Sequence, residues 1–116
     1  MAKNIKFGDL GTDALILDFS FADFPGPIKI GTVRSGHVVR NTVVRIDTAF
    51  DGGSEMTVGD MLAQARLQAV SDNQPEFVNH WNVNNAYEYT TTTDIYLFFP
   101  NGTPAQGVGR IYVFLD

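Results

Sequence analysis

Cysteine is absent from the 116-residue sequence. Its absence excludes disulfide scaffolding, thiolate catalysis and cysteine-ligated zinc or iron–sulfur sites together. Small extracellular domains usually carry disulfides, so we expect this chain to fold in a reducing cytosol. The first residues contain no long apolar run, and no stretch approaches the ~18 apolar residues of a membrane span. The sequence therefore predicts neither a signal peptide nor a membrane anchor.

Charge is also sparse, at 18% of residues, where about a quarter is usual. Eight scattered Lys and Arg residues stand against 13 acidic ones, for a net charge of −5. Without a basic cluster the chain cannot neutralise a phosphate backbone or an anionic lipid surface, so we expect no nucleic-acid or membrane partner. Few charges together with 12% aromatic residues indicate either a large core or a surface that partners cover.

Motifs for catalysis and cofactor binding are missing as well. The two histidines, His37 and His80, stand apart from each other and from other ligand types, so they form no zinc pattern. The glycine-rich phosphate loops and the nucleophile-elbow motif do not occur. The acidic turn from Asp51 to Glu55 is either a calcium loop with hard oxygen ligands or a solvated turn, and it lacks EF-hand spacing. We predict no catalytic, metal-binding or cofactor-binding residues, and hence a protein that is not an enzyme.

Alternation of apolar and polar side chains predicts most of the secondary structure. In residues 13–21 and 37–50 every second side chain is apolar, as in a strand with one buried face. Further strands are predicted at 28–32, 77–85, 87–99 and 108–115, separated by glycine, proline and asparagine turns. Six to eight such strands predict an all-β domain, an antiparallel β-sandwich that is jelly-roll-like. Residues 13–116 form this single domain, and residues 1–12 an N-terminal arm or edge segment.

One short helix is predicted at residues 57–70. Thr57 followed by Asp60 makes a start that resembles a capping box. The apolar residues Val58, Met61 and Leu62 fall on one stripe, and good helix formers follow them.

The most informative feature is the end of the chain, where 95–99 and 111–115 are expected to pair as a hairpin. One of its faces is ordinary core. The other carries aromatic side chains and one arginine where a water-facing strand should be polar. Either a loop or the helix of the same chain covers this face, or another subunit does, since these residue types are enriched at interfaces. The predicted interface residues are Tyr96, Phe98, Arg110, Tyr112 and Phe114.

A second candidate site surrounds Trp81. Together with Tyr87 and Tyr89 it lies among several asparagines. Aromatic rings stack on sugar faces while amides bind hydroxyl groups, so these residues form a candidate ligand platform. The alternative is that Trp81 anchors the core of a small sandwich.

Three segments, read in order, resemble small virion proteins of tailed bacteriophages, in particular jelly-roll head decoration (cement) proteins. The resemblance covers residues 40–116. The segments are Phe50-Asp51-Gly52-Gly53 with Thr57-Val58-Gly59-Asp60, then Thr92-Thr93-Asp94-Ile95-Tyr96, then Gly107-Val108-Gly109-Arg110-Ile111-Tyr112-Val113.

The resemblance implies a structural role without catalysis. Such a protein is made in the host bacterial cytoplasm and assembles on the capsid surface of the virion. There it binds the major capsid protein and other copies of itself, stabilising the head between capsid subunits. The alternative function, based on the Trp81 group, is a carbohydrate- or receptor-binding module of a phage tail or another virion component.

Overall fold

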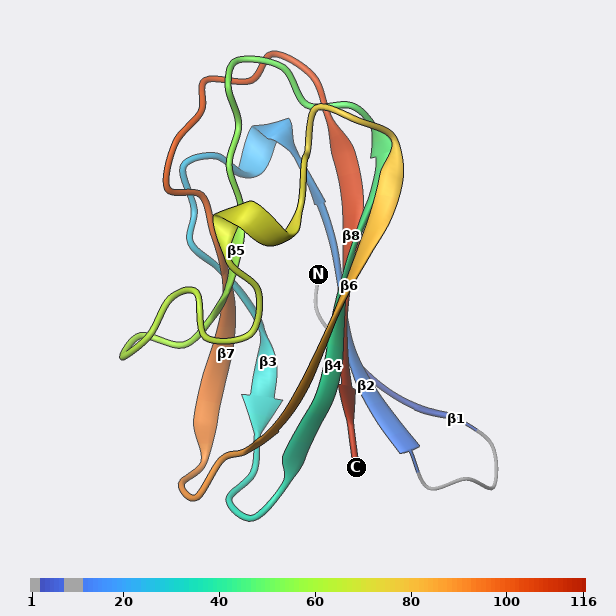
Figure 1. Cartoon of the computed structure of the whole chain (residues 1–116), viewed down its shortest axis with the longest axis vertical. Helices are drawn as coiled ribbons and strands as arrows, with labels where there is room; N and C mark the ends of the chain where they lie inside the picture. The colour runs from blue at the N-terminus through green and yellow to red at the C-terminus, as the bar shows by residue number, and fades with distance from the viewer. Residues whose placement is uncertain (1–2, 8–11) are drawn as a thin grey trace.

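The computed structural model describes the backbone of residues 3–7 and 12–116 and the side chains of residues 13–116. The chain forms two antiparallel sheets packed face to face (Figure 1). Sheet A has five strands in the order β1 (Lys3–Phe7), β2 (Thr12–Ser20), β8 (Val108–Leu115), β4 (Val38–Thr48) and β6 (Asn79–Glu88). Sheet B has three, in the order β3 (Ile28–Val33), β7 (Thr93–Phe98) and β5 (Thr57–Gly59). The predicted all-β sandwich is confirmed.

From β2 onward, the chain changes sheet with every strand. The strands β2, β4, β6 and β8 belong to sheet A, and the intervening β3, β5 and β7 belong to sheet B. Sequential strands therefore face each other across the core instead of pairing, which is the winding of a jelly roll. The edge strand β1 differs, because it pairs directly with β2.

The core lies between the sheets and follows the predicted alternation. On sheet A, Leu15 and Leu17 of β2 point inward together with Val44 and Ile46 of β4. Ile95 and Leu97 of β7 face them from sheet B, and all six are buried. A period of two gives each strand one apolar row, and the two rows close on each other. At one end of the sandwich the Phe19 and Phe50 rings stack at 5.6 Å.

The prediction of a helix at 57–70 is wrong. Residues Thr57–Gly59 form the short edge strand β5, a compact loop follows, and the only helical turn in this segment is the 3₁₀ helix η3 (Val70–Asp72). Val58 is buried in the core, whereas Met61 and Leu62 of the same predicted stripe are exposed. These three side chains therefore do not form the buried face of a helix. In the described part of the chain, no helix is long and apolar enough to span a membrane.

The predicted pairing of 95–99 with 111–115 is also wrong, because β7 and β8 belong to different sheets. The intervening loop crosses the end of the sandwich instead of turning back. It is held there by hydrogen bonds from Thr103 N to Gly52 O at 3.0 Å and from Phe21 N to Gly107 O at 3.0 Å. Phe21 begins the 3₁₀ helix η2 (Phe21–Asp23). The alternation of both strands is real, but their outward side chains lie on opposite sides of the molecule.

Candidate protein-interaction surface

The outer face of sheet A carries an apolar stripe. Strand register places Ile16, Tyr112 and Val43 side by side in one row, and Ala14 beside Phe114 in the next. Ala14 is 0% exposed and Ile16 5%, although both point away from the core between the sheets. A sheet face that meets water is normally polar. This face instead resembles the apolar centre of a protein interface.

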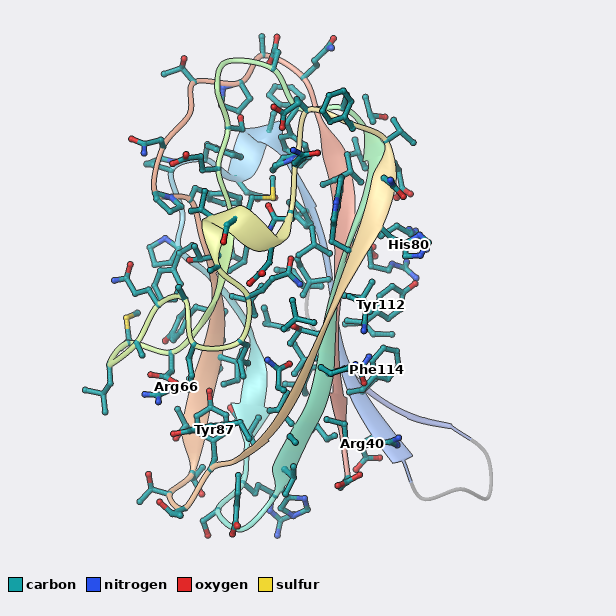
Figure 2. The ribbon with its side chains drawn as sticks, in the orientation of Figure 1. Arg40, Arg66, His80, Tyr87, Tyr112 and Phe114 are labelled. Atoms are coloured by element: carbon teal, nitrogen blue, oxygen red, sulfur yellow. The ribbon has the colours of Figure 1, made fainter. Side chains whose placement is uncertain are left out.

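Two aromatic rings dominate this face. The Tyr112 and Phe114 rings are parallel within 5°, with centroids 5.7 Å apart. Both point away from sheet B (Figure 2). Arg45 donates a hydrogen bond to the Tyr112 hydroxyl at 3.0 Å, and the guanidinium groups of Arg45 and Arg110 each lie 5.9 Å from the Tyr112 ring centroid. The rings are thus held in a fixed orientation on a flat surface.

Ion pairs and amides surround the stripe. Arg110 donates to both carboxylate oxygens of Asp18, at 2.6 and 3.1 Å, and Arg45 does the same to Asp47, at 2.9 and 3.1 Å. The hydrogen bond from Arg110 lowers the pKa of Asp18 below its ordinary value, although burial opposes the shift. Such exposed pairs stabilise a fold little, but they fix the positions of charges around an apolar centre.

On the β6 side the rim of this surface is a ladder of amides. Asn41 donates to Asn82 at 2.7 Å, and Asn82 donates to Asn84 at 3.1 Å. Apolar centre, ionic frame and amide rim together form what we call the sheet A surface, which comprises Ala14, Ile16, Asp18, Asn41, Val43, Arg45, Asn82, Arg110, Tyr112 and Phe114.

Three of the five predicted interface residues belong to the sheet A surface: Arg110, Tyr112 and Phe114. The prediction of one joint face is wrong for the other two, Tyr96 and Phe98, which lie on the outer face of sheet B. Their rings contact each other at 5.8 Å. Phe98 is only 6% exposed. It lines a hollow together with Pro25 and Pro27, and neighbouring residues of the same chain leave little of it exposed.

Sequence reasoning missed Ile16 and Arg45 as parts of this surface. A signal existed for Ile16. The run Ala14-Leu15-Ile16-Leu17 is continuously apolar, which is more than one buried face requires. Arg45 gave no such signal, because its position beside Tyr112 depends on the pairing of β4 with β8.

The prediction of a ligand platform at Trp81, Tyr87 and Tyr89 does not match the structure. In β6, Trp81 and Tyr87 face sheet B and pack against the core, whereas Asn82 and Asn84 point outward. Asn85 faces inward and donates to the Leu67 carbonyl oxygen at 2.8 Å. Tyr89 is 4% exposed, and its hydroxyl donates to Asp60 at 2.9 Å. Stacking on a sugar requires exposed ring faces beside free amides. Here the rings pack against the core, Asn82 and Asn84 lie on the other face of the strand, and the Asn85 amide is bound within the chain. The core-anchor interpretation of Trp81 is the one that fits.

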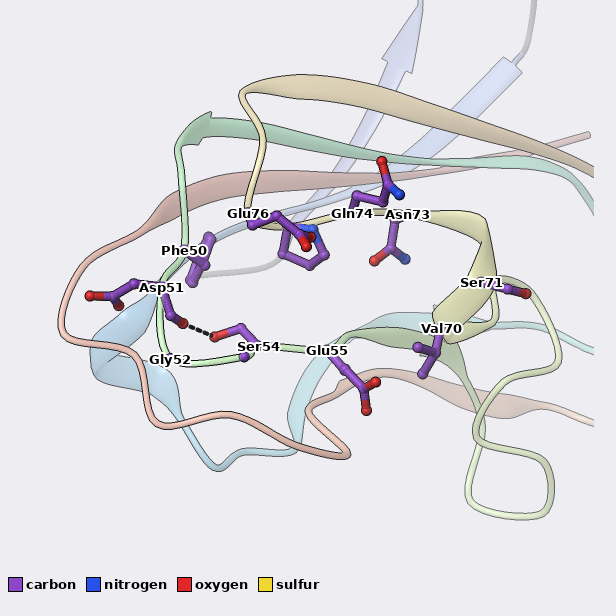
Figure 3. A pocket seen from close by; sticks show the side chains of 12 residues that line it. Phe50, Asp51, Gly52, Ser54, Glu55, Val70, Ser71, Asn73, Gln74 and Glu76 are labelled. Carbon is purple, nitrogen blue, oxygen red and sulfur yellow. Dashed lines mark hydrogen bonds between the residues drawn. The ribbon is translucent and has the colours of Figure 1, made fainter.

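The acidic turn borders a cleft of about 530 Å³ between residues 50–55 and 70–76 (Figure 3). Its carboxylates bind protein groups. Asp51 accepts from the backbone N–H of Ala105 at 2.7 Å, and Glu55 accepts from Asn101 at 2.7 Å. Within the described residues, no group of three or more His, Asp or Glu side chains is close enough together to hold a metal ion. The turn thus fixes the loop that crosses the end of the sandwich.

These observations define the class of the protein, a jelly-roll β-sandwich with an aromatic outer sheet face. A scan against protein-family models gives no match, and neither does a search of curated protein sequences. Similar folds occur in solved phage capsids. A chain of the cyanophage Pam1 capsid asymmetric unit matches with a TM-score of 0.64 and 18% identity, over 90% of this chain and 83% of that one.

A chain of the acid-stable capsid of Helicobacter pylori bacteriophage KHP30 matches with a TM-score of 0.71 and 12% identity. The match covers 99% of this chain and 92% of the other. At these identities the likeness establishes a shared fold. The resemblance to small phage virion proteins, inferred from turns and strand edges, is therefore confirmed at the level of the fold.

Proposed function

We propose that this chain is a structural, non-catalytic virion protein of a bacteriophage. It decorates the capsid surface and binds between major capsid subunits through the sheet A surface. The observation that carries the proposal is the stacked pair Tyr112 and Phe114, whose rings are only partly buried on an outward sheet face. The shared fold with chains of two phage capsid structures supports it.

The mechanism is added interface area. A protein that bridges neighbouring capsid subunits stabilises the assembled shell over its separated parts, because opening the shell must also break these contacts. The molecule measures 38 × 30 × 22 Å, and Figure 1 views the sheets edge-on down the shortest axis. Each outer sheet face thus spans about 38 by 22 Å, close to the roughly 800 Å² that each partner of a standard interface buries.

The polar groups of the sheet A surface determine how the partner is oriented. The pairs Arg110–Asp18 and Arg45–Asp47 are formed before binding, so they need no reordering when a partner docks. A partner surface with complementary charges at the two pairs and an apolar centre fits this arrangement.

The test compares two tyrosines that point outward from central strands of opposite sheets. Tyr112→Ser removes a ring from the sheet A surface, and Tyr96→Ser removes one from sheet B. Co-sedimentation with shells assembled from the major capsid protein of the same genome measures binding. We expect Tyr96→Ser to bind like the unmodified chain and Tyr112→Ser at least tenfold more weakly, about 1.4 kcal/mol.

Circular dichroism and urea unfolding check that both variants fold. If Tyr112→Ser unfolds, Asn82→Arg tests the exposed rim of the same surface instead. Equal binding by Tyr112→Ser or Asn82→Arg and the unmodified chain contradicts the proposed docking surface. Failure of the unmodified chain to bind contradicts the proposed function.

A further inference from the structure

The loop of residues 60–66 holds two large apolar side chains in solvent. Met61 is 58% exposed and Leu62 94% exposed. In Figure 1 this loop, drawn in lime green after β5, projects from the side of the sandwich away from sheet A. We call this projection, formed by Met61 and Leu62, the knob.

The base of the knob is fixed by one buried carboxylate. Asp60 is 2% exposed, and it accepts hydrogen bonds from the backbone N–H groups of Leu62 and Ala63 at 3.0 and 2.9 Å. Arg66 donates to it at 2.7 Å and Tyr89 at 2.9 Å. A loop with this many bonds to one side chain is ordered before any partner binds, which lowers the entropic cost of binding.

Two further contacts hold the loop in place, one to β6 of sheet A and one to β5 of sheet B. Arg66 donates to the Tyr87 hydroxyl at 3.0 Å, and its guanidinium lies 4.9 Å from the Tyr87 ring centroid. Gly59 lies so close to the loop that a Cβ atom there would come within 2.3 Å of the Ala63 carbonyl oxygen. The knob is therefore a rigid projection, and the Leu62 side chain at its tip is almost fully exposed.

An apolar hollow lies directly beside the knob. It has a volume of about 250 Å³ and is lined by Pro25, Pro27, Met61, Gln64, Phe98, Phe99 and Pro100, none of them charged. Apolar cavities of ~150 Å³ already accept benzene, so a leucine side chain fits this hollow. The chain thus presents a projecting leucine and an apolar recess of suitable size on the same face.

The charges on this face do not oppose a partner of the same kind. Two ion pairs on this side form within the chain, Lys29 with Asp94 at 3.3 Å and Asp60 with Arg66 at 2.7 Å. The whole chain carries −5, so two copies repel each other through most of their surface. At the neutral knob and hollow that repulsion is smallest.

We propose that the outer face of sheet B binds a second copy of this chain, with Leu62 of each copy seated in the hollow of the other. This inference goes beyond the proposed function and does not depend on it. It uses the face opposite the sheet A surface, so a self-associated chain keeps its capsid-binding face free.

Sedimentation equilibrium of the purified chain tests the proposal, with Leu62→Asp as the variant and Val78→Asp as its matched control. Val78 is 65% exposed and lies outside the knob and the hollow. We expect the unmodified chain and Val78→Asp to associate equally, and Leu62→Asp to raise the dissociation constant at least tenfold. A chain that stays monomeric up to about 1 mM, or equal association of all three, overturns the proposal.

The absence of cysteine allows a second test by disulfide formation. Leu62→Cys and Pro100→Cys are made in separate chains with tags of different size, mixed, and oxidised. We expect a mixed disulfide dimer between them, and far less when Val78→Cys replaces Pro100→Cys. Equal yields from the two mixtures overturn the proposal. Because neither test contains capsid shells, their failure leaves the sheet A surface as the proposed capsid contact, and failure of shell binding leaves self-association standing.

Discussion

The two outer sheet faces both carry apolar side chains, but they hold them in different ways. On sheet A, Ala14 and Ile16 are almost fully buried within the face. On the sheet B side, Leu62 is almost fully exposed at the tip of a loop. One face is a flat aromatic surface framed by ion pairs, and the other has a projection beside a hollow.

The width of each sheet explains the difference. Sheet A has five strands, and sheet B has three. In the wide sheet, the outward residues Ala14 and Ile16 belong to a strand that is flanked on both sides, and they are buried. In the narrow sheet, residues 60–66, which follow β5, form no strand, and beyond them the chain returns through one isolated bridge, Val58 with Gln68. Its apolar residues therefore leave the plane of the sheet.

The largest expected effect concerns the carboxylate that fixes the knob. Asp60→Ala leaves Arg66 and two backbone N–H groups without their acceptor, and we expect it to lower the free energy of unfolding by about 3 kcal/mol. Urea denaturation measures this value. Asp94→Ala, which removes an exposed carboxylate on the same sheet, should cost less than about 1 kcal/mol. Equal losses from both substitutions would show that the hydrogen bonds of Asp60 stabilise the fold no more than an exposed carboxylate does.

The next prediction compares Ile16, an apolar residue packed in the sheet A face, with Leu62, which projects into solvent. Ile16→Ala removes buried side-chain volume and should lower the free energy of unfolding by about 2 kcal/mol. Leu62→Ala should change it by less than about 0.5 kcal/mol, because Leu62 is already exposed. Thermal and urea unfolding of the two variants give the comparison. A large loss from Leu62→Ala would mean that the knob packs within its own chain.

A pH titration of stability tests the Asp60 network without removing a side chain. Burial alone would raise the pKa of Asp60, but hydrogen bonds from Arg66, Tyr89 and the Ala63 N–H outweigh it and hold this pKa below its ordinary value. A lowered pKa in the folded state stabilises the fold above about pH 4, the range of an unfolded aspartate, and this contribution is lost as the pH falls through the folded-state pKa. The stability of the unmodified chain should therefore fall more steeply in acid than that of Asp60→Ala. Parallel curves would contradict the account.

The smallest expected effect concerns the ionic frame of sheet A. Asp18→Asn should change the free energy of unfolding by less than about 0.5 kcal/mol, because the Asp18 side chain is 62% exposed. In shell binding the same substitution should have a larger effect, since Arg110 loses the partner that orients it. Urea unfolding and co-sedimentation, measured on one preparation, separate stability from docking.

Local patterns in the sequence predicted the strands well and their partners poorly. The alternation in 13–21 and 37–50 appears in β2 and β4, because each strand needs one apolar face. The pairing of 95–99 with 111–115 failed, because nothing local shows that a loop crosses to the other sheet. The helix at 57–70 failed since Asp60, expected to cap a helix, binds instead the loop, Arg66 and Tyr89.

The candidate site was predictable only in part. Tyr112 and Phe114 stand at outward positions of a strand, and alternation alone identifies them. The contributions of Ile16 and Arg45 depend on which strands flank β8, and this is a property of the whole jelly roll. The knob escaped prediction because Met61 and Leu62 matched a helical stripe, and only the folded chain shows them exposed.

The most direct test of the central claim is a cryo-EM reconstruction of capsid shells decorated with this chain. The account predicts that Tyr112 and Phe114 face the capsid subunits, that the ion pairs Arg110–Asp18 and Arg45–Asp47 lie at the edge of the contact, and that Leu62 points away from the shell. A reconstruction in which sheet A faces solvent while another surface contacts the capsid would contradict it.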